Sequence, residues 1–301
     1  MWGRQNEIKT GVLRRSAGAG AFAPACPEAA PAGARVLAVA SGKGGVGKSN
    51  LTVNLGLALA ALEQRVIILD ADLGLANVEV LLGVTPPVNL FDCLYRGRDI
   101  HDALVPAPGG VRFISGGSGF LELANLDQQR RSQLVASLAQ LDGEADFLLI
   151  DTGAGISKNV LAFLAAAGEV IVVITPEPTS LTDGYALIKV LSRFRSHREV
   201  LLAVSRAAGG AEARETARRV EAAAGRFLDI GVRYLGAIYE DRAVNRAVRA
   251  QRPFMLAEPR SRPARAVADM AGQLLTGRRE EAAVRRPGIN GFFSRLARAF
   301  G

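Results

Sequence analysis

The chain has 301 residues, of which 49% are hydrophobic and 22% are charged, and it carries a formal net charge of +8. This composition supplies enough apolar material for a large folded core and excludes wholesale disorder. Two cysteines and two histidines are too few for a disulfide framework, a four-cysteine metal site or a histidine-rich one.

The beginning of the chain differs in composition from the rest. Residues 1–15 form a short N-terminal arm, and residues 16–34 consist almost wholly of Ala, Gly and Pro. Such a segment cannot bury enough surface to offset the entropy of ordering it, so we predict a disordered linker. Its prolines interrupt any apolar core of a secretory signal, and we expect a cytoplasmic protein.

Residues 35–276 alternate between two kinds of segment. Runs rich in β-branched residues and leucine are separated by segments of helical length, which is typical of an α/β fold with a mostly parallel, doubly wound sheet flanked by helices. We predict strands at residues 36–40, 65–70, 111–115, 146–150, 169–174, 199–204 and 233–238. We predict helices at residues 48–62, 128–141, 157–166, 179–194, 211–224, 241–250 and 261–275. A polar linker, 277–288, then leads to a separate last segment, 289–301.

The first predicted strand runs directly into the loop Ser41-Gly42-Lys43-Gly44-Gly45-Val46-Gly47-Lys48-Ser49, and a helical segment follows. This is the GxxxxGK[ST] pattern in its strand, loop and helix context. The glycines let backbone N–H groups approach phosphate oxygens, and the helix N-terminus favours negative charge. Lys48 supplies a compact cation for the β- and γ-phosphates, and Ser49 is expected to place its hydroxyl on Mg²⁺. We expect the loop from Gly42 to Ser49 to bind nucleotide.

The lysines of the chain are unevenly placed. There are 32 arginines and only five lysines, and two of these lysines, Lys43 and Lys48, lie in the loop. The loop resembles the deviant Walker A loop of the MinD/ParA ATPases, which are P-loop NTPases of the SIMIBI type. The resemblance implies ATP as the nucleotide, an ATP-bound homodimer, and a catalytic Lys43 that reaches across the dimer to the partner's phosphates.

Three aspartates follow predicted strands. Asp70 and Asp72 come at the end of strand 65–70, and Asp151 follows strand 146–150. Ligands of parallel sheets bind at the carboxyl ends of the strands, and chemistry at a γ-phosphate needs a positioned water and a hydrated metal. The resemblance implies that Asp72 orients the attacking water, that Asp70 supports the metal shell and that Asp151 contacts Mg²⁺ through water. The alternative for Asp70 and Asp72 is that they only cap a loop.

The expected base site departs from the family pattern. Where the family has an asparagine after the strand equivalent to 199–204, this chain has Ser205-Arg206, and Tyr239 replaces a later proline. We expect Arg206 to belong to the nucleotide site. The choice of ATP over GTP follows from the resemblance alone.

The C-terminal segment is predicted to be an amphipathic helix. At 3.6 residues per turn, one face collects the apolar residues Ile289, Phe292, Phe293, Leu296 and Phe300. The segment lies in a basic region, because residues 241–301 hold thirteen arginines, no lysine and five acids, which accounts for the whole excess of +8. We predict an interfacial anchor on the anionic cytoplasmic face of the cell membrane, strengthened by ATP-driven dimerisation. The alternative is a helix docked on its own domain.

Three stretches, the first of which contains the phosphate loop, narrow the resemblance. They are similar to the FlhG-type branch of the family and read SGKGGVGKSNLTVNLGLALA, ILDADLGLANVEVLLG, and LLIDTGAGIS followed by ITPEPTSLTDGYALIK. This branch regulates flagellar number and placement, which implies an FlhF-type GTPase, C-ring components or a flagellar transcription factor as partners. The N-terminal arm keeps only Leu13-Arg14 of the branch's GTPase-activating motif.

Other functions of the same superfamily stay open. One alternative is a division-site ATPase of the MinD type. Another is a ParA-type DNA-partitioning ATPase, for which Arg242, Arg246 and Arg249 would form a basic stripe at positions i, i+4 and i+7. Iron–sulfur carriers are disfavoured because Cys26 and Cys93 do not form a paired motif, and no substrate-pocket signal points to an ATP-dependent ligase.

Overall fold

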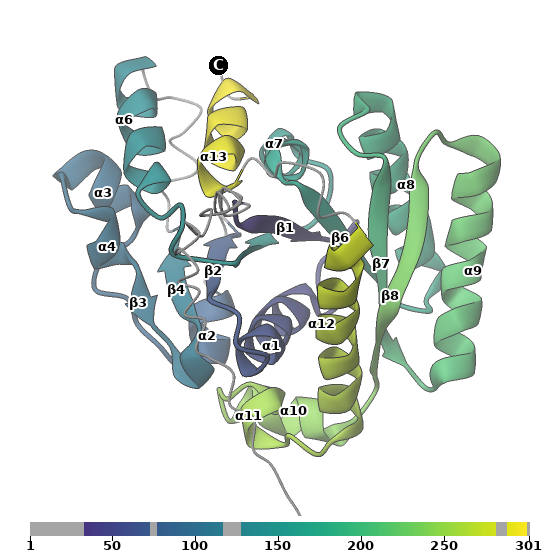
Figure 1. Cartoon of the computed structure of the whole chain (residues 1–301). Coiled ribbons are helices and arrows are strands. Elements are labelled where there is room, and N and C mark those ends of the chain that lie inside the picture. Colours follow the sequence, from purple (N-terminus) through teal and green to yellow (C-terminus); the bar gives the residue numbers. More distant parts are fainter. Residues whose placement is uncertain (1–32, 73–76, 117–127, 281–287, 300–301) are drawn as a thin grey trace, which may run out of the picture. The chain divides into compact units, whose positions relative to one another are not determined.

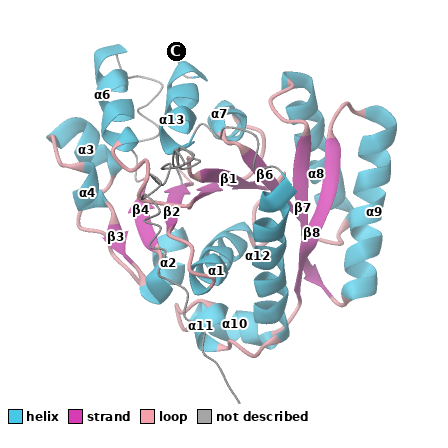
Figure 2. Cartoon of the chain, in the orientation of Figure 1, coloured by secondary structure: helices cyan, strands magenta, loops and turns pink. Residues whose placement is uncertain are grey.

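The protein is described by a computed structural model that covers residues 33–72, 77–116, 128–280 and 288–299. In this part of the chain the strands form one sheet in the order β3-β4-β2-β5-β1-β6-β7-β8, parallel throughout except for the antiparallel pair β3 and β4 (Figures 1 and 2). The strands are β1 (Arg35–Ala40), β2 (Val66–Ala71), β3 (Val105–Pro106), β4 (Arg112–Ser115), β5 (Phe147–Thr152), β6 (Glu169–Ile174), β7 (Glu199–Ala207) and β8 (Gly231–Tyr239).

The central strands are buried on both faces, which explains their uninterrupted apolar sequences. Every residue of β1, β2 and β5 is buried. Side chains of β1 alternate between two cores, because Leu37 and Val39 belong to one hydrophobic cluster and Val36 and Ala38 to the other. The sheet therefore lies between two layers of helices, as a doubly wound fold requires.

The first helical layer packs with Leu37 and Val39. It consists of α1 (Lys48–Ala61), α2 (Asn77–Leu82), α10 (Arg242–Arg249), α11 (Phe254–Ala257) and α12 (Arg262–Glu280). The second layer consists of α3 (Leu90–Arg96), α4 (Ile100–Ala103), α6 (Gln128–Ala139), α7 (Lys158–Ala166), α8 (Pro178–Phe194), α9 (Gly210–Phe227) and α13 (Gly288–Ala299). A short 3₁₀ turn, η1 (Pro108–Gly110), joins β3 to β4.

The predicted elements agree with the structure to within a few residues. All seven predicted strands are present, and each predicted helix corresponds to a helix of the structure. The two-residue strand β3 and the short helices α2, α3, α4 and α11 were not predicted. Helix α12 extends to Glu280, so residues 277–280, which we predicted as part of a polar linker, are helical, and the rest of that linker up to residue 287 lies outside the described residues. The predicted arm 1–15 and most of the linker 16–34 lie outside the described residues.

Helix α13 corrects the prediction of a separate last segment. It lies over the sheet between α6 and α7 (Figure 1), and its apolar residues Ile289, Phe292, Phe293 and Leu296 are buried in the same cluster as Phe163 of α7. The predicted apolar face is therefore real, but the chain's own domain covers it, as in the docked alternative. Phe300, the fifth residue predicted on this face, lies outside the described residues.

Polar contacts hold both ends of α13. The Ile289 N–H donates a hydrogen bond to Asp142 Oδ1 over 3.0 Å. Near the other end, the Arg295 guanidinium donates to the backbone oxygen of Ala166, the last residue of α7, with its Nε at 2.8 Å. Since Arg295 caps the end of α7, α13 is fixed by directional contacts as well as by burial of its apolar face.

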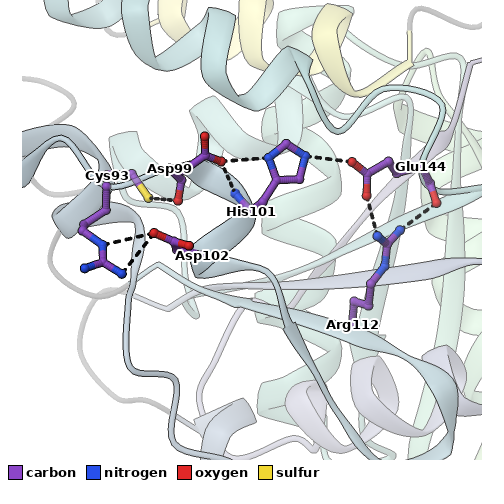
Figure 3. A network of polar contacts seen from close by, with 7 residues as sticks. Cys93, Asp99, His101, Asp102, Arg112 and Glu144 are labelled. Carbon is purple, nitrogen blue, oxygen red and sulfur yellow. Dashed lines mark hydrogen bonds and ion pairs between the residues drawn. The ribbon is translucent and has the colours of Figure 1, made fainter.

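A polar network ties α4 and β4 to the connection before β5 (Figure 3). His101 bridges two acids, with Nδ1 2.8 Å from Asp99 Oδ1 and Nε2 2.9 Å from Glu144 Oε1. Glu144 also accepts a hydrogen bond from Arg112 of β4. The hydrogen bonds to Asp99 and Glu144 raise the pKa of His101.

Candidate functional site

The predicted phosphate loop joins β1 to α1, at the carboxyl edge of the sheet. Gly45 and Gly47 have φ angles of 76° and 95°, which favour glycine, and Gly47 immediately precedes α1. A Cβ atom on Gly44 or Gly45 would meet nothing within 4 Å, so this stretch of backbone is open to a ligand. Gly42, in contrast, packs directly on the backbone of Asp183 in α8. The loop is therefore supported from one side and open on the other, as a phosphate cradle requires.

Lys48 and Asp151 lie together at the base of this cradle. Lys48 Nζ is 4.0 Å from Asp151 Oδ1, and both side chains are buried. Thr52 Oγ1 donates a hydrogen bond to the same carboxylate over 3.2 Å, and the Ser49 side chain lies close enough to lower the pKa of Asp151. Burial raises the pKa of Asp151, and the charge of Lys48 opposes this shift. The structure thus brings together three predicted site residues, Lys48, Ser49 and Asp151.

Asp70 and Asp72 are adjacent to this group. Asp70 is the register partner of Asp151 in the neighbouring strands β2 and β5. Its carboxylate accepts hydrogen bonds from the N–H groups of Asp72 at 3.0 Å and Val78 at 3.3 Å. Burial, helped by the charge of Asp151, raises the pKa of Asp70 to about 7. Asp72 Oδ1 lies beside Gly153, in the loop that follows Asp151. All three predicted aspartates therefore meet at one edge of the sheet, although Asp70 also holds the backbone around Asp72.

The donor set at Asp151 fits a magnesium ion. Asp151 Oδ2 is buried and has no hydrogen-bond partner among the described residues, and the Ser49 side chain lies near the same carboxylate. Within the described part of the chain, no group of three or more His, Cys, Asp and Glu side chains could hold a metal alone. Mg²⁺ prefers one or two carboxylates together with water and substrate phosphates, so this sparse set suits it.

Lys43 is placed apart from Lys48. Its Nζ is 2.6 Å from Glu177 Oε2 and 3.0 Å from Thr179 Oγ1, at the start of α8. The hydrogen bond from Lys43 lowers the pKa of Glu177. Lys43 therefore contacts the start of α8, and its partner Glu177 was not predicted from the sequence.

Arg206 lines a pocket next to the loop. The pocket has a volume of about 420 Å³ and is bounded by the ends of β7 and β8, by the start of α1 and by α10. Its lining residues are Gly47, Asn50, Ser205, Arg206, Ile238, Tyr239, Glu240, Asp241, Val244, Asn245 and Val248. The Arg262 guanidinium stacks over the Tyr239 ring at 3.8 Å from its centroid. Arg206, which we expected in the nucleotide site, thus lies beside the loop, whereas Asn50 and α10 were not predicted as neighbours of it.

A family model agrees with this geometry. The ParA model, described as NUBPL iron-transfer P-loop NTPase, matches residues 33–275. The chain belongs to the ParA family of P-loop NTPases. Members of this ParA/MinD family are ATPases, and the match confirms the predicted fold class.

Individual relatives refine the comparison. The antiactivator FleN of Pseudomonas aeruginosa is 42% identical over 228 residues, which cover 76% of this chain and 81% of FleN. The flagellum site-determining protein YlxH of Helicobacter pylori is 32% identical over 270 residues, or 89% of this chain and 91% of YlxH. The septum site-determining protein MinD of Pyrococcus horikoshii, solved in complex with Mg-ADP, aligns with a TM-score of 0.64 at 26% identity. That alignment covers 81% of this chain and 98% of the MinD chain. The predicted resemblance to FlhG-type proteins is confirmed.

Proposed function

We propose that this ParA-family member is an FlhG-type regulatory ATPase that controls flagellar number and placement by ATP-dependent dimerisation. The observation that carries the proposal is the loop with two lysines, joined to three aspartates, in a chain similar to FleN and YlxH over most of its length. A division-site role remains the main alternative, because MinD proteins share the fold. Deletion of the gene in its host, followed by counting flagella by electron microscopy, tests the flagellar role.

Each site residue has a task in this proposal. The open backbone at Gly44 and Gly45 binds phosphate oxygens, and Lys48 places a positive charge beside them. Ser49 and Asp151 would hold Mg²⁺, which, when bound, neutralises negative charge on the phosphates. Asp72 orients the attacking water. Asp70 positions Asp72 through its hydrogen bond to the Asp72 N–H.

Lys43 is assigned the trans-acting role that the resemblance implies. In one chain Lys43 is held by Glu177 and Thr179, which belong to a different element from the phosphate cradle. Reaching a partner's phosphates requires these contacts to break. Because ion pairs at the surface contribute only about 0.2–1 kcal/mol, phosphate is a competitive replacement for Glu177.

Membrane attachment through α13 requires its release. No helix in the described part of the chain is long and apolar enough to cross a bilayer. Attachment by the apolar face of α13 would be interfacial, and this face is buried on the domain. We therefore place release of α13 before membrane binding, on the cytoplasmic face of the membrane. Sedimentation with anionic vesicles in ATP, in ADP, and in ATP after deletion of residues 289–301 tests attachment through α13; retention of the deleted chain would contradict it.

Two other functions of the family are less well supported. For iron transfer, burial raises the pKa of Cys93 to about 11, so its thiol stays protonated at neutral pH, and Cys26 lies outside the described residues. For DNA partitioning, the middle residue of the predicted arginine stripe, Arg246, is paired with Glu258 at 2.7 Å. The similarity to FleN and YlxH therefore supports the regulatory ATPase more strongly than Cys93 and the arginine stripe support these two functions.

A further inference from the structure

Helices α8 and α9 end next to an open groove with a strongly basic lining. The groove has a volume of about 600 Å³. We call its cationic side chains and the two phenylalanines that end these helices the α8–α9 basic end. Its members are Lys189, Arg193, Phe194, Arg195, Arg226 and Phe227.

The cations of the α8–α9 basic end are not neutralised by neighbours. Lys189, Arg193, Arg195 and Arg226 form no ion pair with any residue that the structure describes, and Asp229 is the only acid lining the groove. Other arginines nearby are paired, such as Arg233 with Glu199. The favourable interaction of a cation with a helix C-terminus explains one such side chain in the last turn of a helix. It does not account for the several cations of the groove, whose positive charge exceeds the charge of Asp229.

Arg195 has an unusual backbone conformation for an arginine. It follows the last residue of α8 with a φ of 49°, in the left-handed region that glycine normally occupies at this position. A side chain in this conformation is strained. The chain nevertheless carries a cation there, and this cation is exposed to solvent.

The phenylalanines that end α8 and α9 are exposed; Phe227 lines the groove, and Phe194 lies between the lining residues Arg193 and Arg195 in the chain. Phe194 is 63% exposed and Phe227 is 66% exposed, the highest values for large hydrophobic side chains in the described part of the chain. The Arg226 guanidinium lies over the Phe227 ring at 5.2 Å. Exposed aromatic rings among cations are typical of surfaces that meet a lipid interface, where rings enter the headgroup region and cations contact phosphate.

The position of this surface leaves the nucleotide site free. Since α8 leads into β7 and α9 into β8, the α8–α9 basic end lies at the amino ends of the strands, opposite the phosphate loop. The contact of α13 with Ala166 is at the same edge, just before β6. His197, in the connection from α8 to β7, lies 3.1 Å from the backbone oxygen of Ala167. The site where α13 docks and the α8–α9 basic end thus lie next to each other at the amino ends of the strands.

We propose that the α8–α9 basic end is a second membrane contact, which binds the headgroups of anionic phospholipids while α13 inserts its apolar face. This inference rests on the proposed membrane attachment through α13. A short amphipathic helix binds a bilayer marginally, and stable anchoring takes two signals. Each cation near an anionic surface strengthens membrane binding roughly fivefold. A dimer presents two such surfaces, so its affinity for the membrane is substantially higher than that of one chain.

The experiment compares variants of the full chain with ATP in sedimentation assays. The test variant combines Arg193→Gln, Arg195→Gln and Arg226→Gln. The matched control removes the same charge from exposed positions outside the basic end, with Arg252→Gln, Arg260→Gln and Arg265→Gln. A third variant, Phe194→Ser with Phe227→Ser, tests the rings. ATP hydrolysis without vesicles verifies that each variant is folded.

Vesicles of phosphatidylcholine with phosphatidylglycerol are the probe, and vesicles of phosphatidylcholine alone and duplex DNA are the comparisons. We expect the test variant to lose at least about tenfold in affinity for the anionic vesicles, and the control to stay within about twofold of the original chain. The Phe194→Ser, Phe227→Ser variant is expected to lose the part of the vesicle binding that persists in high salt, because the contact of the rings with lipid is not electrostatic.

The outcomes separate this inference from the proposed function. If the original chain sediments, deletion of residues 289–301 abolishes sedimentation and the test variant behaves like the control, only the second contact is overturned. If the folded original chain does not sediment at all, both the second contact and membrane attachment through α13 are overturned. Loss of DNA retention in the test variant with unchanged vesicle binding would overturn the lipid assignment in favour of nucleic acid.

Discussion

Substitution of Asp142 by alanine is expected to release α13 and increase membrane binding. The apolar face of α13 contributes roughly 6–12 kcal/mol by burying four large side chains, at about 1.5–3 kcal/mol each. A bilayer buries the same face again, so this contribution largely cancels between the docked and inserted states. The balance then depends on smaller directional contacts. Asp142 accepts a hydrogen bond from the Ile289 N–H, and its carboxylate stays on the domain when the helix leaves.

The magnitude follows from that one contact. A hydrogen bond to a charged group contributes about 1.5 kcal/mol or more, which corresponds to roughly a tenfold shift toward the released helix. Sedimentation with anionic vesicles at limiting ATP measures the shift. Asp102→Ala is the matched control, because Asp102 pairs with Arg98 through side chains that are about half exposed and it is not in contact with Ile289. If Asp142→Ala lowers the free energy of unfolding but leaves vesicle binding unchanged, release of α13 does not limit membrane attachment.

Three further predictions concern single side chains. Lys48→Ala is expected to abolish ATP binding in a fluorescent-nucleotide titration, because its buried ammonium is the cation beside the phosphate cradle; retained affinity would place the phosphates elsewhere. Glu177→Gln is expected to lower the ATP concentration for half-maximal dimerisation by up to about fivefold, measured by light scattering, because it weakens the contact that holds Lys43; an increase would mean that Glu177 supports the dimer. In an NMR titration, the midpoint for the His101 ring is expected above pH 6.5 and the midpoint for the His197 ring below it. Hydrogen bonds to acids raise the pKa of His101, whereas burial lowers the pKa of His197. The stabilisation from His101 is therefore complete below pH 6.5 and is lost as the pH rises through its raised pKa, and the reverse order of the two resonances would contradict the bridge in Figure 3.

Local sequence patterns were sufficient for the sheet and for the phosphate loop. Each buried parallel strand is a continuous apolar run, and the loop contains its own glycines and lysines, so both are encoded in consecutive residues. The short elements between β2 and β4 were missed because helices of four to seven residues have too few turns to show an amphipathic period. The strand β3 has only two residues and produces no pattern at all.

Contacts between distant segments could not be predicted in the same way. The helical wheel placed Ile289, Phe292, Phe293 and Leu296 on one face, but a wheel does not distinguish a bilayer from a groove between α6 and α7, since both are apolar. The pairing of Lys43 with Glu177 joins residues 134 positions apart in the chain, and nothing near either residue indicates it. The pocket next to Arg206 likewise needs α10 and the ends of two strands. These features depend on tertiary packing.

The central claim is that two chains form a dimer when each binds ATP and that hydrolysis of the ATP separates them. The most direct test is the mass of Asp72→Ala in excess Mg-ATP, measured by light scattering coupled to size exclusion. With the water-orienting carboxylate removed, we predict a stable particle of twice the 31.7 kDa of one chain, and a return to monomer when Lys43→Ala is added. A monomeric Asp72→Ala protein that still binds ATP would contradict the account.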